Sequence, residues 1–171
     1  MAMTFSECMQ RQWCHWRSSA AKGRRLFPAD ALTRLGAAIT EGEQRHRGEV
    51  RLIVEHALAS DLIWAGVSNR QRALALFAEY GVWDTADRCG VLIYVNLADQ
   101  KVDIVVDRNI GQRIDPQTWD QICRGMTAGF KRADFEASTL AAIEQVNALL
   151  AAQFPGTGPR ANDLPDHPVM L

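Results

Sequence analysis

The chain has 171 residues, of which 47% are hydrophobic, 8% aromatic and 23% charged, a composition typical of a soluble globular protein with one domain. A chain of this length buries about 70% of the surface that its unfolded form exposes, so its core requires no disulfide or metal ion. Its 19 Lys and Arg against 20 Asp and Glu give a formal net charge of -1, which excludes the strongly basic surface typical of a nucleic-acid-binding protein.

No segment of the sequence is expected to cross a membrane or to direct export. The longest strongly apolar run, residues 90–97, is much shorter than the roughly 20 residues that span a bilayer. The N-terminal part scatters Arg and Trp along its length and lacks the continuous apolar stretch of a secretory signal. The cysteines form no CxxC pair, which favours reduced thiols. We therefore expect a cytoplasmic protein.

Residues 1–27 form a basic segment in which apolar residues recur at helical spacing. Five Lys or Arg stand there against one acid, and Phe5, Met9, Trp13 and Trp16 follow one another at intervals of three or four. This spacing predicts an amphipathic helix. Two placements stay open: the apolar side packs on the protein's own core, which is the commoner arrangement, or it makes a peripheral contact with an anionic membrane surface.

Residues 28–154 carry the alternating patterns of one α/β domain. A first helix is expected to begin at Pro28 and to end before Gly48. Residues 50–56 alternate imperfectly between apolar and polar, which predicts an edge strand with one poorly covered face. Its last residue, His56, has no second ligand at metal-binding spacing, so we expect a packed or rim histidine.

The next elements complete the predicted sheet. A capping box at residues 68–71 predicts a helix over 69–80. Residues 91–96 are apolar at almost every position, as in a central strand covered on both faces, and 101–107 alternate as its antiparallel partner.

Two more helices are expected after Asp115 and over 136–153. The strands at 50–56 and 91–96 should pair in parallel through a crossover, with helices on both faces. The fold class predicted is α/β, a three-layer α/β/α sandwich around a small mixed sheet. Residues 155–171 hold four of the six prolines without an apolar period, so we expect a disordered tail there.

The stretch from Trp83 to Ile110 resembles the TPM domain family. The resemblance is carried by WDTADRCGVLIYV, then a short turn, then ADQKVDIVVDRNI; further along, the residues KRADF at 131–135 stand where the family often has GDY. It extends over residues 28–154 and implies the same α/β/α sandwich. Members of the family resemble, variously, acid phosphatases that bind divalent cations, photosystem-repair factors and receptor modulators. Cys89 replaces the usual Asn before the glycine, and Asp107-Arg108 stands where many members have Thr-Gly. These departures, with no expected signal or membrane anchor, indicate a cytoplasmic branch.

The two ends of the predicted hairpin bring polar residues together, because an antiparallel pair places the start of its first strand beside the end of its second. Three carboxylates there would supply the oxygen ligands that Ca²⁺ or Mg²⁺ takes, and two guanidinium groups and an amide would bind a phosphate. The carboxylates are Asp84, Asp87 and Asp107, and the other three residues are Arg88, Arg108 and Asn109. A cluster of solvated ion pairs without function fits the same residues.

No motif of a catalytic nucleophile or of a phosphate-binding loop occurs in the sequence. Cys89 lies beside Arg88, yet its place at the entry to an apolar strand favours a buried, inert thiol. Two functions remain open. The first is a non-enzymatic interaction or accessory module with an unknown protein partner, with room for a divalent cation. The alternative is a metal-dependent phosphatase acting on a phosphoester.

Overall fold

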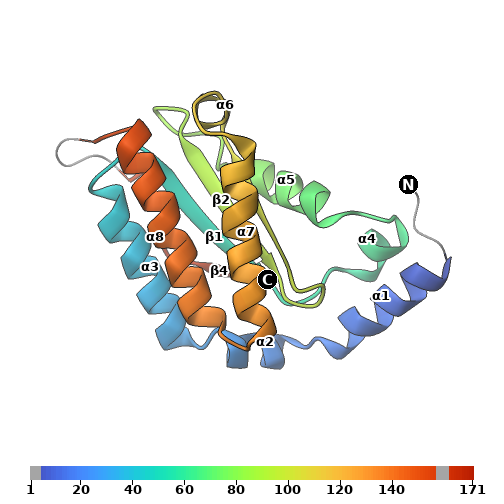
Figure 1. Ribbon diagram of the computed structural model, residues 1–171. Coiled ribbons are helices and arrows are strands. Elements are labelled where there is room, and N and C mark those ends of the chain that lie inside the picture. The colour runs from blue at the N-terminus through green and yellow to red at the C-terminus, as the bar shows by residue number, and fades with distance from the viewer. Residues whose placement is uncertain (1–4, 157–161) are drawn as a thin grey trace.

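The structure is a computed structural model that describes residues 5–156 and 162–171. Three helices cover one face of a four-stranded sheet and one helix covers the other, in three layers (Figure 1). In chain order the elements are α1 Phe5–Arg17, α2 Ala20–Leu26, α3 Ala29–Glu43, β1 Glu49–Glu55, α4 Ser60–Trp64, α5 Asn69–Glu79, β2 Gly90–Asn96, β3 Lys101–Val106, α6 Arg108–Gly111, α7 Pro116–Lys131, α8 Phe135–Gln153 and β4 Val169–Met170. This confirms the predicted α/β/α sandwich.

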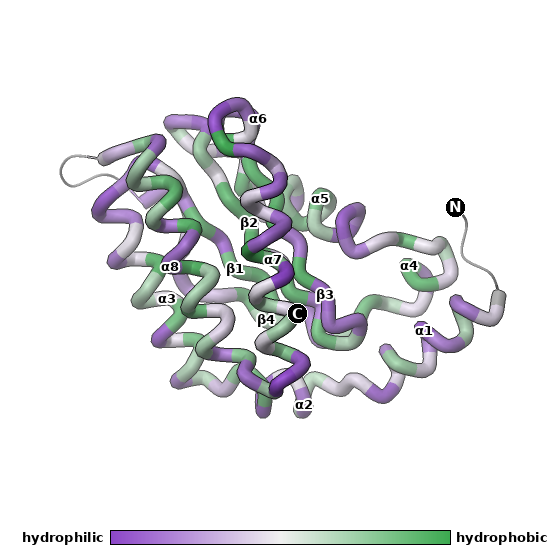
Figure 2. The backbone as a smooth tube through the Cα atoms, in the orientation of Figure 1, coloured by the Kyte–Doolittle hydropathy of each residue, from purple (hydrophilic) through white to green (hydrophobic). Residues whose placement is uncertain are grey.

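The sheet is mixed, with the strand order β3-β2-β1-β4. β1 pairs in parallel with β2, with Val50 opposite Val91, and β2 pairs antiparallel with β3, with Ile93 opposite Ile104. Both pairings were predicted from the sequence. Every residue of β2 is buried because helices and chain segments cover both of its faces, and the most hydrophobic stretches of backbone lie in this middle layer (Figure 2).

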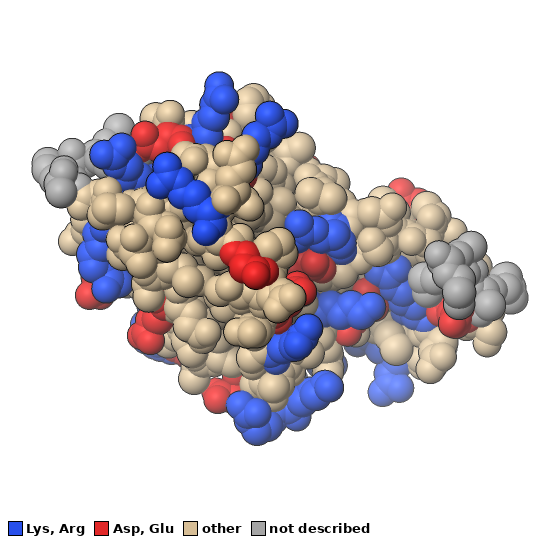
Figure 3. All heavy atoms as spheres, turned by 45° about the horizontal axis from the view of Figure 1, so that its top comes forward, with Lys and Arg blue, Asp and Glu red and all other residues tan. Residues whose placement is uncertain are grey.

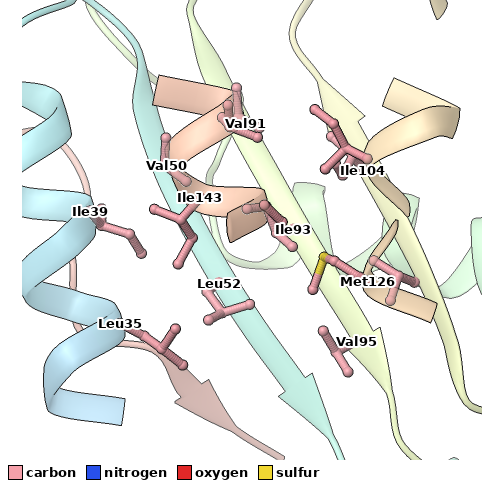
Figure 4. Packing of buried hydrophobic residues seen from close by; sticks show 14 of the residues in the cluster. Leu35, Ile39, Val50, Leu52, Val91, Ile93, Val95, Ile104, Met126 and Ile143 are labelled. Atoms are coloured by element: carbon pink, nitrogen blue, oxygen red, sulfur yellow. The ribbon is translucent and has the colours of Figure 1, made fainter. Parts of the chain in front are cut away.

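The larger core lies between the sheet and the three helices α3, α7 and α8. Alternate residues of each strand point into it, as period-2 geometry requires. Figure 4 shows this packing, with Leu35 and Ile39 from α3, Val50 and Leu52 from β1, Val91, Ile93 and Val95 from β2, Ile104 from β3, Met126 from α7 and Ile143 from α8. The smaller core on the other face is built around Ile53, Leu76, Leu92 and Tyr94.

The helix starts follow the capping signals in the sequence. Ser68 accepts a hydrogen bond from the backbone of Gln71, whose side chain accepts one from the Ser68 backbone, so the capping box of α5 is complete. Asp115 accepts from the Gln117 backbone and Pro116 occupies the first position of α7. These caps satisfy backbone N–H groups that the helices themselves leave without partners.

The prediction of an edge strand at residues 50–56 is wrong. All seven residues of β1 are buried, and the strand lies between β2 and β4. Its polar side chains are buried with partners. Arg51 donates to the backbone carbonyls of Pro165 and His167, and Glu55 accepts from Arg72 and from the Tyr94 hydroxyl. The imperfect alternation therefore reflected buried polar groups that are paired, rather than a solvated face.

The prediction of a disordered tail is wrong for residues 162–171, while 157–161 lie outside the described residues. β4 pairs in parallel with Ile53 and Val54 of β1, and Leu164 is buried in the smaller core. His56, at the rim, donates to the carbonyl of Leu171. An extended segment can bury single apolar side chains and pair its backbone with a strand, and neither feature leaves an apolar period in the sequence.

Candidate functional site

The two loops at the start of β2 and the end of β3 meet, as the hairpin argument predicted. The side-chain amide of Asn109 donates to the carbonyl of Asp87 at 3.1 Å, with Cys89 Sγ at 3.5 Å. The Asp107 backbone N–H donates to the carbonyl of Gly90 at 2.9 Å. The structure therefore brings Asp87, Asn109 and Asp107 to one end of the sheet.

Asp107 has one oxygen in a structural role and one without a partner. Oδ1 accepts from the Arg108 backbone at 2.6 Å and so caps the first turn of α6. Oδ2 is buried and has no hydrogen-bond partner among the described residues. Because a buried carboxylate oxygen without a partner is unfavourable, this atom is the one group of the predicted set with an unmet requirement for a ligand.

The three predicted carboxylates do not form a ready-made metal-binding group. Asp84 is exposed in a turn whose backbone bonds to Gly81, and Asp87 is half-buried. Within residues 5–156 and 162–171, no three His, Cys, Asp or Glu side chains lie close enough to hold a metal ion together. The two predicted guanidinium groups, on Arg88 and Arg108, are both exposed.

A pocket of about 190 Å³ at this end is lined by Arg47, Asp87, Cys89, Asn109 and Arg113, with the C-terminal end of α8. Arg113 lies over the Phe154 ring, 4.8 Å from its centroid, and donates to the Gln153 carbonyl. Basic and acidic side chains are intermixed on the upper part of the molecule, where α6 lies (Figure 3). The arginines that line the pocket are thus different from the two that were predicted.

Sequence reasoning missed Arg47 because it precedes β1, 60 residues or so before Asn109 in the chain. A signal existed: parallel strands begin at the same end of a sheet, so the residue before β1 must lie near the residue before β2. Arg113 carried no comparable signal, because α6 and the turn after it are too short to be predicted from periodicity.

The Cys89 thiol lies at this site and is not activated. The residue is buried, and burial together with the negative charge of Asp87 raises the pKa of the thiol, while the Asn109 amide opposes this shift. A protonated thiol is a poor nucleophile and a poor metal ligand. This supports the interpretation of Cys89 as an inert core residue.

At the opposite end of the sheet, α1 docks on the protein through its polar side. Arg11 Nη2 donates to Asp99 Oδ2 at 2.7 Å, and His15 Nε2 lies 3.0 Å from Asp99 Oδ1. Because the Leu58 backbone N–H at 2.8 Å can only donate, His15 Nδ1 accepts and Nε2 carries the proton that is donated to Asp99. Arg11 also donates to the carbonyl of Val67.

The apolar side of α1 faces solvent. Met9 is 51% exposed, Trp13 58% and Trp16 73%, and the rings of the two tryptophans lie 5.4 Å apart. We call these three residues the aromatic face of α1. The expectation that this side packs on the protein's own core is wrong. The physical reason is the carboxylate of Asp99, which is only 10% exposed beneath the helix and pairs with Arg11 and His15 on the polar side of α1.

The sequence model of the TPM domain matches residues 23–149. The chain belongs to the TPM domain family. The fold of this TPM protein is similar to the NMR structure of BA42 protein from the psychrophilic bacterium Bizionia argentinensis, with a TM-score of 0.73 and 25% sequence identity over 83% of this chain and 93% of that one. No curated protein matches. α1 precedes the residues that match the TPM domain, so the aromatic face lies outside the matched region.

Among the described residues of this TPM protein, no helix is both long enough and apolar enough to cross a bilayer.

Proposed function

We propose that this TPM protein is a non-enzymatic interaction module whose contact surface is the aromatic face of α1. A single observation carries the proposal: α1 turns its polar side to the protein and its apolar side to water. Full burial of a large apolar side chain is favourable by about 1.5–3 kcal/mol, and an unliganded module forgoes part of this at Met9, Trp13 and Trp16. A partner that covers these side chains would recover it.

The composition and rigidity of the face support a binding role. Tryptophan and methionine are enriched at interfaces, and tryptophan is among the residues whose truncation weakens binding most. Asp99 fixes the helix through Arg11 and His15, so the two tryptophans are held in place before any partner arrives. Such preorganisation lowers the entropy that is lost on binding.

Site-specific photo-crosslinking in cells that express the protein tests this function. A photoreactive phenylalanine analogue at position 13 or 16 should form adducts, whereas the same analogue at Trp83 should form few. Trp83 is a matched control, because it is 55% exposed and lies in the loop before β2, at the opposite end of the sheet from Asp99. Equal adduct yields at all three positions would contradict the proposal.

A second candidate, a metal-dependent phosphatase, is favoured by one observation: the buried Asp107 Oδ2 lies two residues before Asn109, which lines a pocket with two arginines. On this hypothesis the oxygen contacts Ca²⁺ or Mg²⁺, and Arg113 binds the phosphate. Calorimetry should then detect the cation with the wild type and much less with Asp107→Asn. Hydrolysis of a generic phosphoester should fall about tenfold or more in Arg113→Ala, equivalent to about 1.4 kcal/mol of transition-state stabilisation.

Arg108→Ala is the control that separates the two arginine assignments. Arg108 is exposed and does not line the pocket, so its removal should leave hydrolysis unchanged if Arg113 binds the phosphate. A wild type that binds neither cation and cleaves no phosphoester would exclude the phosphatase. A wild type that binds the cation without hydrolysis would fit an interaction module that also holds a divalent ion.

A further inference from the structure

We propose that the aromatic face of α1 binds an anionic lipid bilayer, with α1 lying in the plane of the headgroups; this inference rests on the proposed function and names the partner. The helix has the properties of an interfacial helix, with aromatic residues on one side and cations around them. Tryptophan is enriched at the boundary between lipid and water, where its ring is in an apolar environment and its N–H can still find a partner.

The charges around the face are complementary to an anionic surface. Four cations on α1 and α2 are exposed, and none of the four forms an ion pair within the part of the chain that the structure describes; they are Arg17, Lys22, Arg24 and Arg25. One acid, Glu7, stands against them in these two helices. Cations close to an anionic leaflet are attracted to it, so the set would add to the stabilisation that comes from burying the tryptophans.

A fifth cation comes from a distant part of the chain. Lys131, exposed at the end of α7, lines the same pocket of about 250 Å³ as Lys22 of α2. α1 and α2 follow one another along the lower edge of the molecule, beyond the sandwich (Figure 1). On this proposal, one flat surface meets the aromatic face of α1 and the cations of α2 together.

The same cations argue against a second copy of this chain as the partner. A symmetric contact places each residue of the interface near the same residues of the partner copy. Two aromatic faces in contact would bring Arg17 and the cations of α2 toward their own counterparts, and like charges in close contact are unfavourable. An anionic bilayer covers the tryptophans and neutralises the cations at once.

Vesicle co-sedimentation of the full chain tests the proposal. The wild type should bind vesicles of equal parts phosphatidylglycerol and phosphatidylcholine at least tenfold more tightly than pure phosphatidylcholine. Binding should weaken as NaCl rises from about 50 mM to about 500 mM, because the Debye length shortens from roughly 14 Å to a few Å. A double variant, Trp13→Ser with Trp16→Ser, should bind at least tenfold more weakly, and Trp83→Ser should bind as the wild type does.

A triple variant in which Gln replaces Lys22, Arg24 and Arg25 tests the role of the charges. It should lose the preference for anionic vesicles, while the tryptophans still give weak binding to both kinds of vesicle. All variants alter exposed side chains, so their thermal unfolding midpoints should match the wild type. If the unfolding midpoint of the double tryptophan variant falls, the single variant Trp16→Ser takes its place in the vesicle assay, because Trp16 is the most exposed residue of the same face.

The outcomes separate the lipid proposal from the function on which it rests. No vesicle binding by the wild type, or equal binding to both vesicles at every salt concentration, would overturn the lipid proposal. Adducts at position 13 without vesicle binding would leave the interaction module in place with a protein partner. Dimerisation that the double tryptophan variant abolishes would make a second copy the partner. If the wild type forms no adducts and also binds no vesicles, both the lipid proposal and the interaction module are overturned.

Discussion

Asp99, in the turn between β2 and β3, accepts a hydrogen bond from the guanidinium of Arg11, 88 residues earlier in the chain, at 2.7 Å. Burial raises the pKa of Asp99, but the hydrogen bonds from His15 and Arg11 outweigh it and lower the pKa to about 2. Asp99 is therefore ionised at neutral pH, and it anchors α1 in the orientation that exposes Trp13 and Trp16.

Asp99→Asn should destabilise the protein by about 3 kcal/mol at neutral pH, because it removes the carboxylate that pairs with the guanidinium of Arg11, and both side chains are only about a tenth exposed. Since the folded pKa is lowered, this stabilisation is present above about pH 4 and is lost as the pH falls toward about 2. Urea unfolding at several pH values measures it. Asp30→Asn, which removes an exposed partner of Arg34, is the control and should leave the midpoint unchanged. Equal midpoints for the two variants would contradict this account.

Glu43 makes stability fall as the pH rises. Burial, the largest cause, together with the nearby Glu49 and Asp166, raises the pKa of Glu43 to about 9, although the Val50 backbone N–H bonds to its carboxyl and opposes the shift. The stability that the protonated form contributes is complete below about pH 4.5 and is lost as the pH rises through about 9. The loss has a maximum slope of about 1.4 kcal/mol per pH unit.

Glu43→Gln should flatten this dependence, because Gln keeps the acceptor for Val50 and has no proton to lose. Unfolding free energies measured at intervals between about pH 5 and about pH 8.5 would show the difference in slope. Glu41→Gln, at an exposed position of the same helix, is the matched control and should leave the slope unchanged. If the wild type and Glu43→Gln show the same slope, Glu43 is not the group responsible.

Gly42→Ala should destabilise the domain by about 2 kcal/mol, although alanine is the better helix former. A Cβ at position 42 would lie 2.0 Å from the side-chain amide of Asn147. That amide donates to the Ala38 carbonyl, and its oxygen lies 3.1 Å from His46 Nε2, so the clash would break a buried network between α3 and α8.

Gly125→Ala, in α7, gives the opposite expectation. Nothing lies within 4 Å of a Cβ built at position 125, so only the helix propensity changes and the stability should rise by up to about 1 kcal/mol. Chemical denaturation of the two variants side by side compares the same substitution in two helices. A stabilised Gly42→Ala would show that Asn147 can move aside at no cost.

Truncation after Gly156 should lower the unfolding midpoint by several degrees. The truncation exposes one edge of β1 and removes the backbone acceptors of Arg51. Leu164→Ala isolates the packing part and should cost about 2–3 kcal/mol, because Leu164 is buried in the smaller core. Leu74→Ala, at a position that is 48% exposed, is the control and should have almost no effect. An unchanged midpoint after truncation would mean that the tail contributes nothing to stability.

At the hairpin end, the rules of strand pairing predict some residues of the candidate site and not others. The meeting of Asp87, Asp107 and Asn109 could be predicted, because an antiparallel pair with a short turn fixes which residues are opposite one another. The arginines of the pocket could not be assigned in this way. Arg47 and Arg113 reach it from segments that converge only once the parallel strands and α8 are in place.

The sequence by itself determined the longer helices and the pairing of the three main strands, because periodicity, capping residues and turn length are local properties. Only the tertiary structure decided which side of α1 faces outward. Hydrophobic spacing defines two sides of a helix, and a buried carboxylate elsewhere in the chain selects between them. Asp99 pairs with Arg11 and His15 on the polar side of α1, and this contact leaves Trp13 and Trp16 on the side that faces water. The same holds for β4, whose two residues have a strand partner only because β1 lies beside them.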